Sequence, residues 1–416
     1  MKILVVGGGG REHAICWALA KSPKVQKIYC APGNGGTAQV AENIAIANTD
    51  FDNLIKFAKD NQIDLTVCPM DDPLVLGIVD AFQGADLRIF GPNKAAAHIE
   101  GSKVYSKDFM IRYGIPTAEY GAYDNLEAAK AHVANAQFPL VIKADGLAVG
   151  KGVIFCHTLD EAEQTLREIF VDKRFGTSGE QVVIEEFLIG ADCSVLAFCD
   201  GQRVVPWPSA MDHKTAYDGN KGPNTGGMGV ISPNPHYTKE IEKECMEKVF
   251  LPTIEGLRKD GREFVGVLFF GLFLTAGGVK VLEYNCRPGD PETQALLPLL
   301  ETDLADIILA CLDKRLDEIE IKWKNNASCC VVAASGGYPG PYATGYPISG
   351  LDACGDALIF HSGTKMADGK VVTSGGRVLS VVAEAKTPQE AQKAAYATLD
   401  KIDFKDMYFR KDIGGK

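Results

Sequence analysis

The sequence predicts an α/β protein in three units, with an open parallel sheet at the N-terminus, a larger central unit, and a small β-rich unit at the end. Its 416 residues correspond to about three domains of ordinary size. Strand and helix patterns alternate over the first hundred residues, which indicates parallel strands joined by crossovers. Strand patterns and turn dipeptides dominate the last part of the chain. We expect boundaries at 1–101, 102–324 and 325–416.

The N-terminal unit begins with a buried strand, Lys2–Val6, followed by a run of four glycines and a helix through Ala20. Apolar runs that end in Pro or Gly predict the following strands. The further elements expected here are the strands Lys27–Cys30, Leu65–Cys68 and Arg88–Phe90 and the helix Asn53–Lys59.

The central unit begins at Ser102, a suitable cap for a helix over Lys103–Arg112 that Gly114 and Pro116 end. Asp290 is expected to cap a later helix that has Pro291 in its first turn. The other expected elements are the strands Pro139–Lys143, Val153–Cys156, Gln181–Phe187, Ser194–Cys199, Phe264–Leu274 and Gly278–Asn285 and the helices Leu159–Ile169 and Lys239–Arg258.

The C-terminal unit contains two predicted hairpin turns, at Asp368-Gly369 and at Ser374-Gly375-Gly376. A final helix is expected after Thr387, because Glu390 stands at the spacing of a capping box.

Composition excludes several classes of protein. A net charge of −11 argues against a dedicated nucleic-acid binder. No apolar run approaches the ~18 residues of a membrane span, so we expect no membrane association. The 12 cysteines contain no CxxC pair, which disfavours a structural zinc site and favours reduced thiols in the cytoplasm.

The first glycine cluster, Gly7–Gly10, lies between strand and helix, where backbone amides and the helix dipole favour an anion. A nicotinamide-binding fingerprint is not met, because Glu12 stands at its third glycine position and the second strand ends without an acid for a ribose. Arg11 would suit a phosphate monoester. A tight turn with a surface arginine is the alternative.

Two later clusters also suggest phosphate chemistry. Lys143 and Lys151 bracket a glycine-rich stretch that departs from a P-loop at Asp145 and Gly152. Two cations beside a flexible loop can hold nucleotide phosphates and close over them. The third cluster, 222–229, follows Asp212-His213-Lys214 and is either a mobile substrate loop or a surface linker.

Acidic side chains provide the remaining signals. Glu185 ends a strand with Phe187 and Leu188 behind it, an arrangement that suits adenine, although solvent-facing acids are the alternative. Glu283 and Asn285 are two apart on a strand and face the same side. Their oxygens suit Mg²⁺ held jointly with substrate phosphates.

In this order the motifs resemble the ATP-grasp superfamily and, within it, the glycinamide ribonucleotide synthetases. The matching strings cover nearly the whole chain: VVGGGGREHA, APGNGGTA, EGSKVYSKDFM, PLVIKADGLAVGKGV, VVIEEFL, DHK, GPNTGGMG, EYNCRPGDPETQ, DGKVVTSGGRVLSV and MYFRKDIG. The resemblance implies an ATP-grasp central domain with a mobile lid at about 117–190. It implies a monomeric enzyme that ligates glycine to 5-phosphoribosylamine with ATP and Mg²⁺ or Mn²⁺, through a glycyl phosphate.

The resemblance also implies roles for individual residues. The ATP phosphates would be bound by Lys103, Lys143 and Lys151, adenine by Glu185, Phe187 and Leu188, and the ribose by Asp192. Glu283 and Asn285 would hold the metal. Phosphoribosylamine would be bound by Gly9, Gly10, Arg11, Asn34 and Gly35, and the glycine and acyl-phosphate end by Asp212, Lys214 and Arg287. These last three, with Lys143, are the expected catalytic residues.

Two positions depart from the family pattern. Asp71 or Asp72 stands near the usual Gly-Pro-Glu glutamate, and Pro288 replaces an aromatic residue. Another ATP-grasp carboxylate–amine ligase and a non-catalytic nucleotide sensor are the alternative functions.

Overall fold

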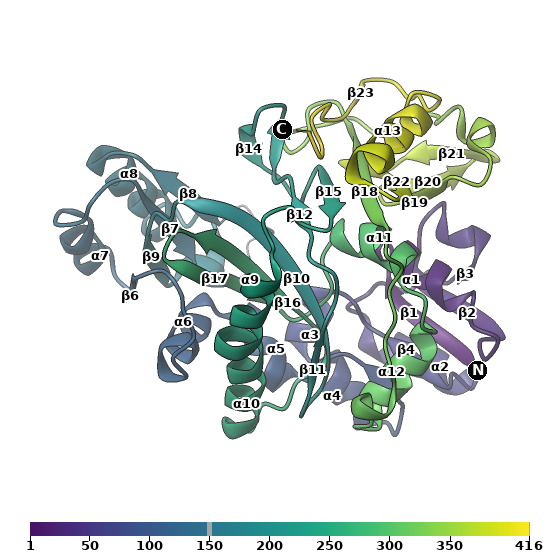
Figure 1. The fold of residues 1–416 in the computed structure, drawn as a ribbon, viewed down its shortest axis with the longest axis horizontal. Helices are drawn as coiled ribbons and strands as arrows, with labels where there is room; N and C mark the ends of the chain where they lie inside the picture. The colour runs from purple at the N-terminus through teal and green to yellow at the C-terminus, as the bar shows by residue number, and fades with distance from the viewer. Residues whose placement is uncertain (148–151, 416) are drawn as a thin grey trace.

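The computed structural model describes residues 1–147 and 152–415 and confirms the predicted mixture of a parallel sheet, a central unit and a C-terminal antiparallel sheet. The N-terminal unit is a parallel sheet of strand order β3-β2-β1-β4-β5, shown in purple at the right of Figure 1. Its strands are β1 (Lys2–Gly7), β2 (Lys27–Pro32), β3 (Glu42–Asn43), β4 (Leu65–Val67) and β5 (Ile89–Phe90).

Helices complete this unit because each parallel strand needs a crossover. Helix α2 begins at a side-chain cap, because the Asp50 carboxylate accepts a hydrogen bond from the amide of Asn53. The apolar residues of β1 are fully buried, as expected of a strand covered on both faces. The helices are α1 (Gly10–Leu19), α2 (Phe51–Asp60), α3 (Asp71–Leu76), α4 (Ile78–Gln83) and α5 (Lys94–Gly101).

A second, antiparallel sheet of order β6-β9-β7-β8 lies at the left of Figure 1, away from the N-terminal sheet. Helices α7 and α8 pack on it, and the apolar residues between them form a separate hydrophobic core. This sheet lies within the range expected for a lid, although its mobility stays a prediction. The elements are β6 (Tyr120–Tyr123), α7 (Leu126–Val133), β7 (Leu140–Ala144), β8 (Val153–Cys156), α8 (Leu159–Phe170) and β9 (Val182–Glu186).

The central sheet has the order β11-β10-β16-β17. Its strands are β10 (Gly190–Asp200), β11 (Val204–Pro206), β16 (Val265–Thr275) and β17 (Gly278–Asn285), and α6 (Lys103–Arg112) lies beside β17 and β9. The long helix expected at Lys239–Arg258 contains a π-helical turn, Met246–Phe250, between α9 (Lys239–Cys245) and α10 (Leu251–Lys259). Pro252 accounts for the interruption, because it offers no amide to the preceding turn.

The C-terminal sheet, β12-β15-β18-β22-β19 with β23 beside β18, includes two strands that precede residue 325. The segment between β10 and α9 therefore joins the C-terminal sheet to the central one. The strands are β12 (Met211–Asp212), β15 (Gly229–Ser232), β18 (Ala327–Ser335), β19 (Leu358–His361), β22 (Arg377–Ala385) and β23 (Met407–Tyr408).

Smaller elements connect the sheets. Two hairpins stand apart, β13 (Thr215–Tyr217) with β14 (Lys221–Asn224) and β20 (Thr364–Ala367) with β21 (Lys370–Thr373). The remaining helices are α11 (Glu292–Leu296), α12 (Leu304–Leu312) and α13 (Pro388–Leu399), with short 3₁₀ turns at Thr37–Gln39, Gly176–Gly179, Leu297–Leu299, Leu316–Glu318 and Leu351–Cys354. Within the described ranges, no helix is long and apolar enough to cross a membrane.

The turn predictions in the C-terminal unit have mixed outcomes. Asp368-Gly369 does close the β20–β21 hairpin, and the capping box before α13 is present. Ser374-Gly375-Gly376 is not a hairpin turn, because β21 pairs with β20 whereas β22 pairs with β18 and β19. The glycines serve a different purpose there, since a Cβ on Gly375 would meet the Cα of Gly363 at 2.9 Å.

The start of the helix after Asp290 also differs from expectation. Helix α11 begins at Glu292 with Pro291 as its cap residue, and no side chain caps it. The Asp290 carboxylate accepts instead from the side-chain amide of Gln294, at 2.7 Å, and pairs with Arg377 at 3.3 Å. A basic side chain from the C-terminal unit therefore outcompetes the local backbone for this carboxylate.

Candidate active site

One cavity of about 1190 Å³ lies among the β6–β9 sheet, the central sheet and the N-terminal unit, and it collects most of the predicted site residues. They come from segments far apart in the chain because the ends of β9 and β17, the start of α6 and the 211–229 segment all meet there. The predicted residues that line it are Arg11, Lys103, Lys143, Glu185, Phe187, Leu188, Asp192, Asp212, Lys214, Glu283, Asn285 and Arg287. Lys151 lies outside the described residues.

The end of the cavity under β9 combines apolar rings with buried charge. Phe187 is 39% exposed and packs edge-on to Phe155, with 6.0 Å between ring centroids. The Glu185 carboxylate is buried, and its Oε1 lies 2.9 Å from Nζ of Lys143 and 3.2 Å from Nζ of Lys107. An apolar wall beside a buried polar group is the usual form of a base-binding site.

Lys107 is a site residue that the sequence reasoning missed. Its ammonium is buried, contacts Glu185, and donates to Thr117 Oγ1 at 2.7 Å. Burial lowers the pKa of Lys107 to about 8, against the opposing effect of Glu185. The available signal was its position four residues after Lys103, which places both lysines on one face of α6.

Asp145 connects the glycine-rich stretch after β7 to the start of α6. Its Oδ1 accepts from the amide of Val104 at 2.7 Å and lies 3.1 Å from the hydroxyl of Ser102. Lys103 Nζ donates to the carbonyl of Gly146 at 2.9 Å. The residue that breaks the P-loop pattern is therefore a helix-capping carboxylate, and the start of α6 that it caps carries Lys103 next to Gly146.

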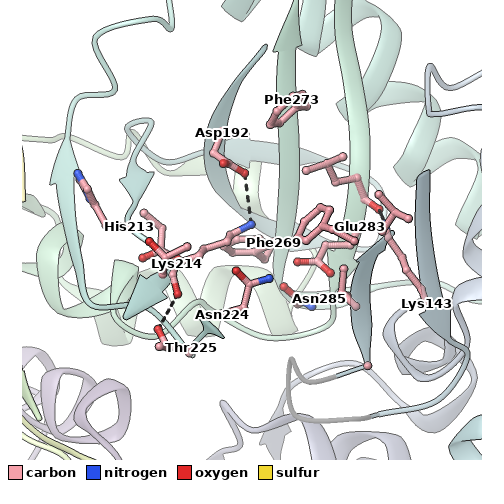
Figure 2. A pocket seen from close by; sticks show the side chains of 18 of the residues that line it. Lys143, Asp192, His213, Lys214, Asn224, Thr225, Phe269, Phe273, Glu283 and Asn285 are labelled. Atoms are coloured by element: carbon pink, nitrogen blue, oxygen red, sulfur yellow. Dashed lines mark hydrogen bonds and ion pairs between the residues drawn. The ribbon is translucent and has the colours of Figure 1, made fainter. Parts of the chain in front are cut away.

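Glu283 stands among four cations. Figure 2 shows it with Asn285, between Lys214 on one side and Lys143 on the other. Burial alone would raise the pKa of Glu283, but Lys214, Lys143, Lys103 and Arg287 outweigh burial and lower it. The carboxylate is therefore held ionised in a strongly positive environment, as an anionic substrate site requires.

Asn285 is oriented by Glu100, a second residue that the sequence reasoning did not identify. Its Nδ2 donates to Glu100 Oε1 at 3.0 Å, while the amide of Cys286 donates to Oε2 at 2.7 Å. Arg287 Nη2 lies 3.2 Å from the same carboxylate. Since the amide nitrogen of Asn285 is engaged, its Oδ1 is left to face the cavity as a ligand oxygen.

The residues present suit a divalent cation. Glu283 and Asn285 offer one carboxylate and one amide oxygen, which are hard ligands preferred by Mg²⁺ and Mn²⁺. In the part of the chain that the structure describes, no three His, Cys, Asp or Glu side chains form a metal cage. Phosphate and water oxygens would complete the shell, which is how Mg²⁺ usually binds with nucleotides.

The opposite side of the cavity carries Lys214 with carboxylates around it. Its Nζ lies 3.4 Å from Asp192 Oδ1, the contact drawn in Figure 2. Asp192 raises the pKa of Lys214 most, with Glu283, Asp212 and Glu292 adding to the effect, so Lys214 stays charged. Desolvation, more than the nearby Glu292, raises the pKa of the Asp212 carboxyl group, and its buried Oδ1 has no hydrogen-bond partner within the described residues.

The hydrogen-bonding groups of the first glycine turn, Gly7–Gly10, are engaged by nearby side chains. The amide of Gly9 donates to Glu12 Oε2 at 2.6 Å, and Arg11 Nε donates to Glu12 Oε1 at 2.6 Å. Asn34 Nδ2 donates to the carbonyls of Gly8 and His361 at 3.0 and 2.6 Å, so this side chain holds the turn together. Direct contacts of Gly9, Gly10, Asn34 and Gly35 with a substrate stay predictions, because these residues do not line the cavity.

The two departures from the family pattern have distinct structural settings. Asp71 lines the cavity with Oδ2 3.9 Å from Arg287 Nη2, whereas Asp72 is exposed and lies outside the lining. The carbonyl of Pro288 accepts from Arg11 Nη1 at 3.1 Å. Of the two acids, Asp71 is therefore the one placed to face a substrate.

Comparison with known proteins gives matches along the whole chain. Family descriptions of phosphoribosylglycinamide synthetase match in three parts: the N domain at 1–100, the ATP-grasp domain at 101–293 and the C domain at 328–416. The phosphoribosylamine–glycine ligase of Clostridium acetobutylicum is 50% identical over 416 residues, covering 100% of this chain and 99% of that protein.

Two further relatives agree. The phosphoribosylamine–glycine ligase of Caldanaerobacter subterraneus is 48% identical over 413 residues, with 99% of both chains covered. The crystal structure of the phosphoribosylamine–glycine ligase of Thermotoga maritima superposes with a TM-score of 0.86 at 32% identity, covering 99% of this chain and 100% of that one.

Proposed function

The chain belongs to the phosphoribosylglycinamide synthetase family, and we propose that its large cavity joins glycine to 5-phosphoribosylamine. As a member of that family it is an ATP-dependent carbon–nitrogen ligase of purine biosynthesis that uses Mg²⁺ or Mn²⁺. The observation that carries the proposal is the set of four cations around Glu283, in the same cavity as the apolar side chains Phe155, Phe187 and Leu188.

The chemistry requires an activated carboxylate, because the carboxylate of glycine is a poor electrophile. The γ-phosphoryl group of ATP passes to a carboxylate oxygen of glycine, giving glycyl phosphate and ADP. The nitrogen of phosphoribosylamine then attacks the acyl carbon, phosphate leaves, and the amide nitrogen loses a proton. Such a sequence needs orientation and charge neutralisation more than a protein nucleophile.

The residues divide the task by position. Lys103, Lys143 and Lys151 neutralise the ATP phosphates, while Phe187 and Leu188 cover adenine. Glu185 faces the base between its two lysine partners, and Asp192 is placed for the ribose. Where it binds, the metal supplies charge neutralisation on the phosphoryl oxygens, and Glu283 and Asn285 hold it.

We assign the glycine and phosphoribosylamine ends of the site to a second group of residues. Arg287 and Lys214 bind the glycine carboxylate and the acyl phosphate, with Asp212 beside them. The glycine turn, through Gly9, Gly10, Arg11, Asn34 and Gly35, serves phosphoribosylamine from the N-terminal side. We further propose that the enzyme is a cytoplasmic monomer, that its domains are bounded at 1–101, 102–324 and 325–416, and that residues 117–190 close over the nucleotide.

ADP release measured with ATP, Mg²⁺ and glycine, with and without freshly generated phosphoribosylamine, tests the function. We expect release that depends on both glycine and the amine. ATP binding without such turnover would indicate a relative with a different acceptor, and failure to bind ATP would refute the proposal.

A further inference from the structure

Arg377, the first residue of β22, reaches the cavity from the C-terminal unit. Its Nη1 donates to the carbonyl of Gly226 at 2.7 Å and to the carbonyl of Asp290 at 2.8 Å. The carbonyl of Gly227 lies at 3.4 Å, and the Asp290 carboxylate at 3.3 Å. One guanidinium group therefore joins the glycine-rich loop before β15 to the turn before α11.

The same loop is hydrogen-bonded to the backbone that carries Lys214. The amide and hydroxyl of Thr225 both donate to the carbonyl of Lys214, each at 2.8 Å. The amide of Met228 donates to the carbonyl of His213 at 2.9 Å. Figure 2 shows the Thr225 contact directly beneath Lys214. A shift of the loop would therefore move the backbone of Lys214.

The loop has few other restraints on this side. Gly226 and Gly227 bear no side chains, so apolar packing cannot fix them, and Gly227 has φ +111, a conformation that favours glycine. A Cβ on Gly226 would meet Arg377 Cζ at 2.9 Å, which places the guanidinium directly against the loop. Tyr338, also from the C-terminal unit, accepts from the amide of Gly226 at 3.1 Å.

We propose that Arg377 is a positioning residue for the ligation, clamping loop 222–229 to the Asp290 turn so that the Lys214 ammonium keeps its place opposite Glu283. The C-terminal unit thereby completes the active site without touching the nucleotide. This role rests on the function proposed above. ATP affinity should be insensitive to it, since Lys103, Lys143 and Glu185 stand on α6, β7 and β9. Within the described residues, the hydrogen bonds and the ion pair of Arg377 go to Gly226, Gly227 and Asp290 and not to these elements.

The test compares Arg377→Lys with Arg315→Lys, a surface arginine that is 51% exposed and serves as the matched control. For both variants we would measure kcat, the KM for glycine, the equilibrium Kd for ATP, and the thermal unfolding midpoint. Amide hydrogen exchange of the peptide covering 222–229 reports on the loop without any need for turnover.

Lysine keeps the charge, but its ammonium is a strongly hydrated point charge on a flexible stem, whereas the planar guanidinium of Arg377 holds Nη1 between the two carbonyls. We expect kcat of Arg377→Lys to fall between about tenfold and a hundredfold, because small misplacements of a charged group have effects of that size. ATP Kd should stay within about twofold, exchange in 222–229 should rise, and Arg315→Lys should match the wild type. Guanidinium at a low, non-denaturing concentration should partly restore an Arg377→Ala variant, whereas ammonium at equal ionic strength should not.

Unchanged kcat and loop exchange in Arg377→Lys would overturn the proposal. So would a parallel loss of ATP binding and of the unfolding midpoint, which indicates general destabilisation. If the wild type itself fails to ligate glycine, the proposed function fails, while faster exchange at 222–229 in the variant would still confirm the clamp.

Discussion

Replacing Glu100 by glutamine tests how the proposed metal ligand Asn285 is held. The carboxylate is only 8% exposed and accepts from Asn285 Nδ2 at 3.0 Å and from the amide of Cys286 at 2.7 Å, with Arg287 at 3.2 Å. Glutamine retains one acceptor oxygen but turns an NH₂ group toward one of these donors. We therefore expect Asn285 to rotate and Arg287 to lose its nearer counter-charge.

The magnitude follows from these contacts. A hydrogen bond to a charged group contributes about 1.5–3 kcal/mol, and the substitution removes at least one. Burial raises the pKa of Glu100 against the effect of Arg287, so desolvation offsets part of the ion-pair gain. Asp71, 3.9 Å from Arg287, also retains part of its charge compensation. We expect a loss of about 2 kcal/mol in the free energy of unfolding.

We expect Glu100→Gln to weaken the apparent Mg²⁺ affinity more than it lowers the stability of the fold. Loss of a group that orients a metal ligand typically weakens metal affinity or activity about 10–100-fold. The assay is ADP formation titrated with Mg²⁺ at saturating ATP, together with thermal unfolding. Glu42→Gln, which breaks an exposed pair with Lys27, is the control and should change stability by less than about 0.5 kcal/mol. Half-saturation by Mg²⁺ equal to that of the wild type in Glu100→Gln would refute the reasoning.

Three other substitutions have defined outcomes. Glu283→Gln should lower turnover at least about a hundredfold, because it removes the carboxylate charge whose pKa the four surrounding cations lower. ADP release at the wild-type rate from a folded variant would contradict this. His13→Asn should reduce the loss of stability that the wild type shows below about pH 6.5. Burial, and to a lesser extent His361, lowers the pKa of His13 to about 3, so the folded protein keeps this side chain neutral and loses stability as pH falls from the pKa of the unfolded state toward that of the folded state. Unfolding midpoints measured between pH 4 and 7 would test this, and an equally steep fall in the variant would contradict it. Gly227→Ala should lower kcat, since a Cβ would meet Asp212 Oδ1 at 2.8 Å and Pro291 Cδ at 2.6 Å; a kcat equal to that of the wild type would show that the loop yields freely.

Local patterns were sufficient for most elements of the fold. The helix Lys103–Arg112 and the strands Val153–Cys156 and Gly278–Asn285 have the bounds expected from their caps and apolar runs. These features depend on neighbours a few residues away, such as the Ser102 hydroxyl that accepts from the amide of Tyr105. Residue order therefore predicts them without knowledge of the tertiary structure.

The errors arose where a distant partner replaced a local one. Asp290 does not cap its helix because Arg377 and Gln294 take its carboxylate, and Ser374–Gly376 links two sheets because Gly363 packs against Gly375. Glu100, Lys107 and Arg377 lie within strings that match the family, but those strings assigned them no role. Their roles depend on contacts with residues far away in the chain, such as Asn285, Glu185 and Asp290.

The candidate site shows the same division between what residue order predicts and what tertiary contacts decide. Chemical type was readable from residue order: period-two spacing placed Glu283 and Asn285 on one face, and the glycine clusters marked backbone turns beside cations. Which of these groups are free to meet a substrate was a matter of tertiary structure. Glu12 accepts from the Gly9 amide, while Glu100 accepts from the Asn285 side-chain nitrogen, which leaves the Asn285 oxygen for the proposed metal. Charge and hydrogen-bonding capacity belong to the residue, but their availability depends on partners that only folding brings within about 3 Å.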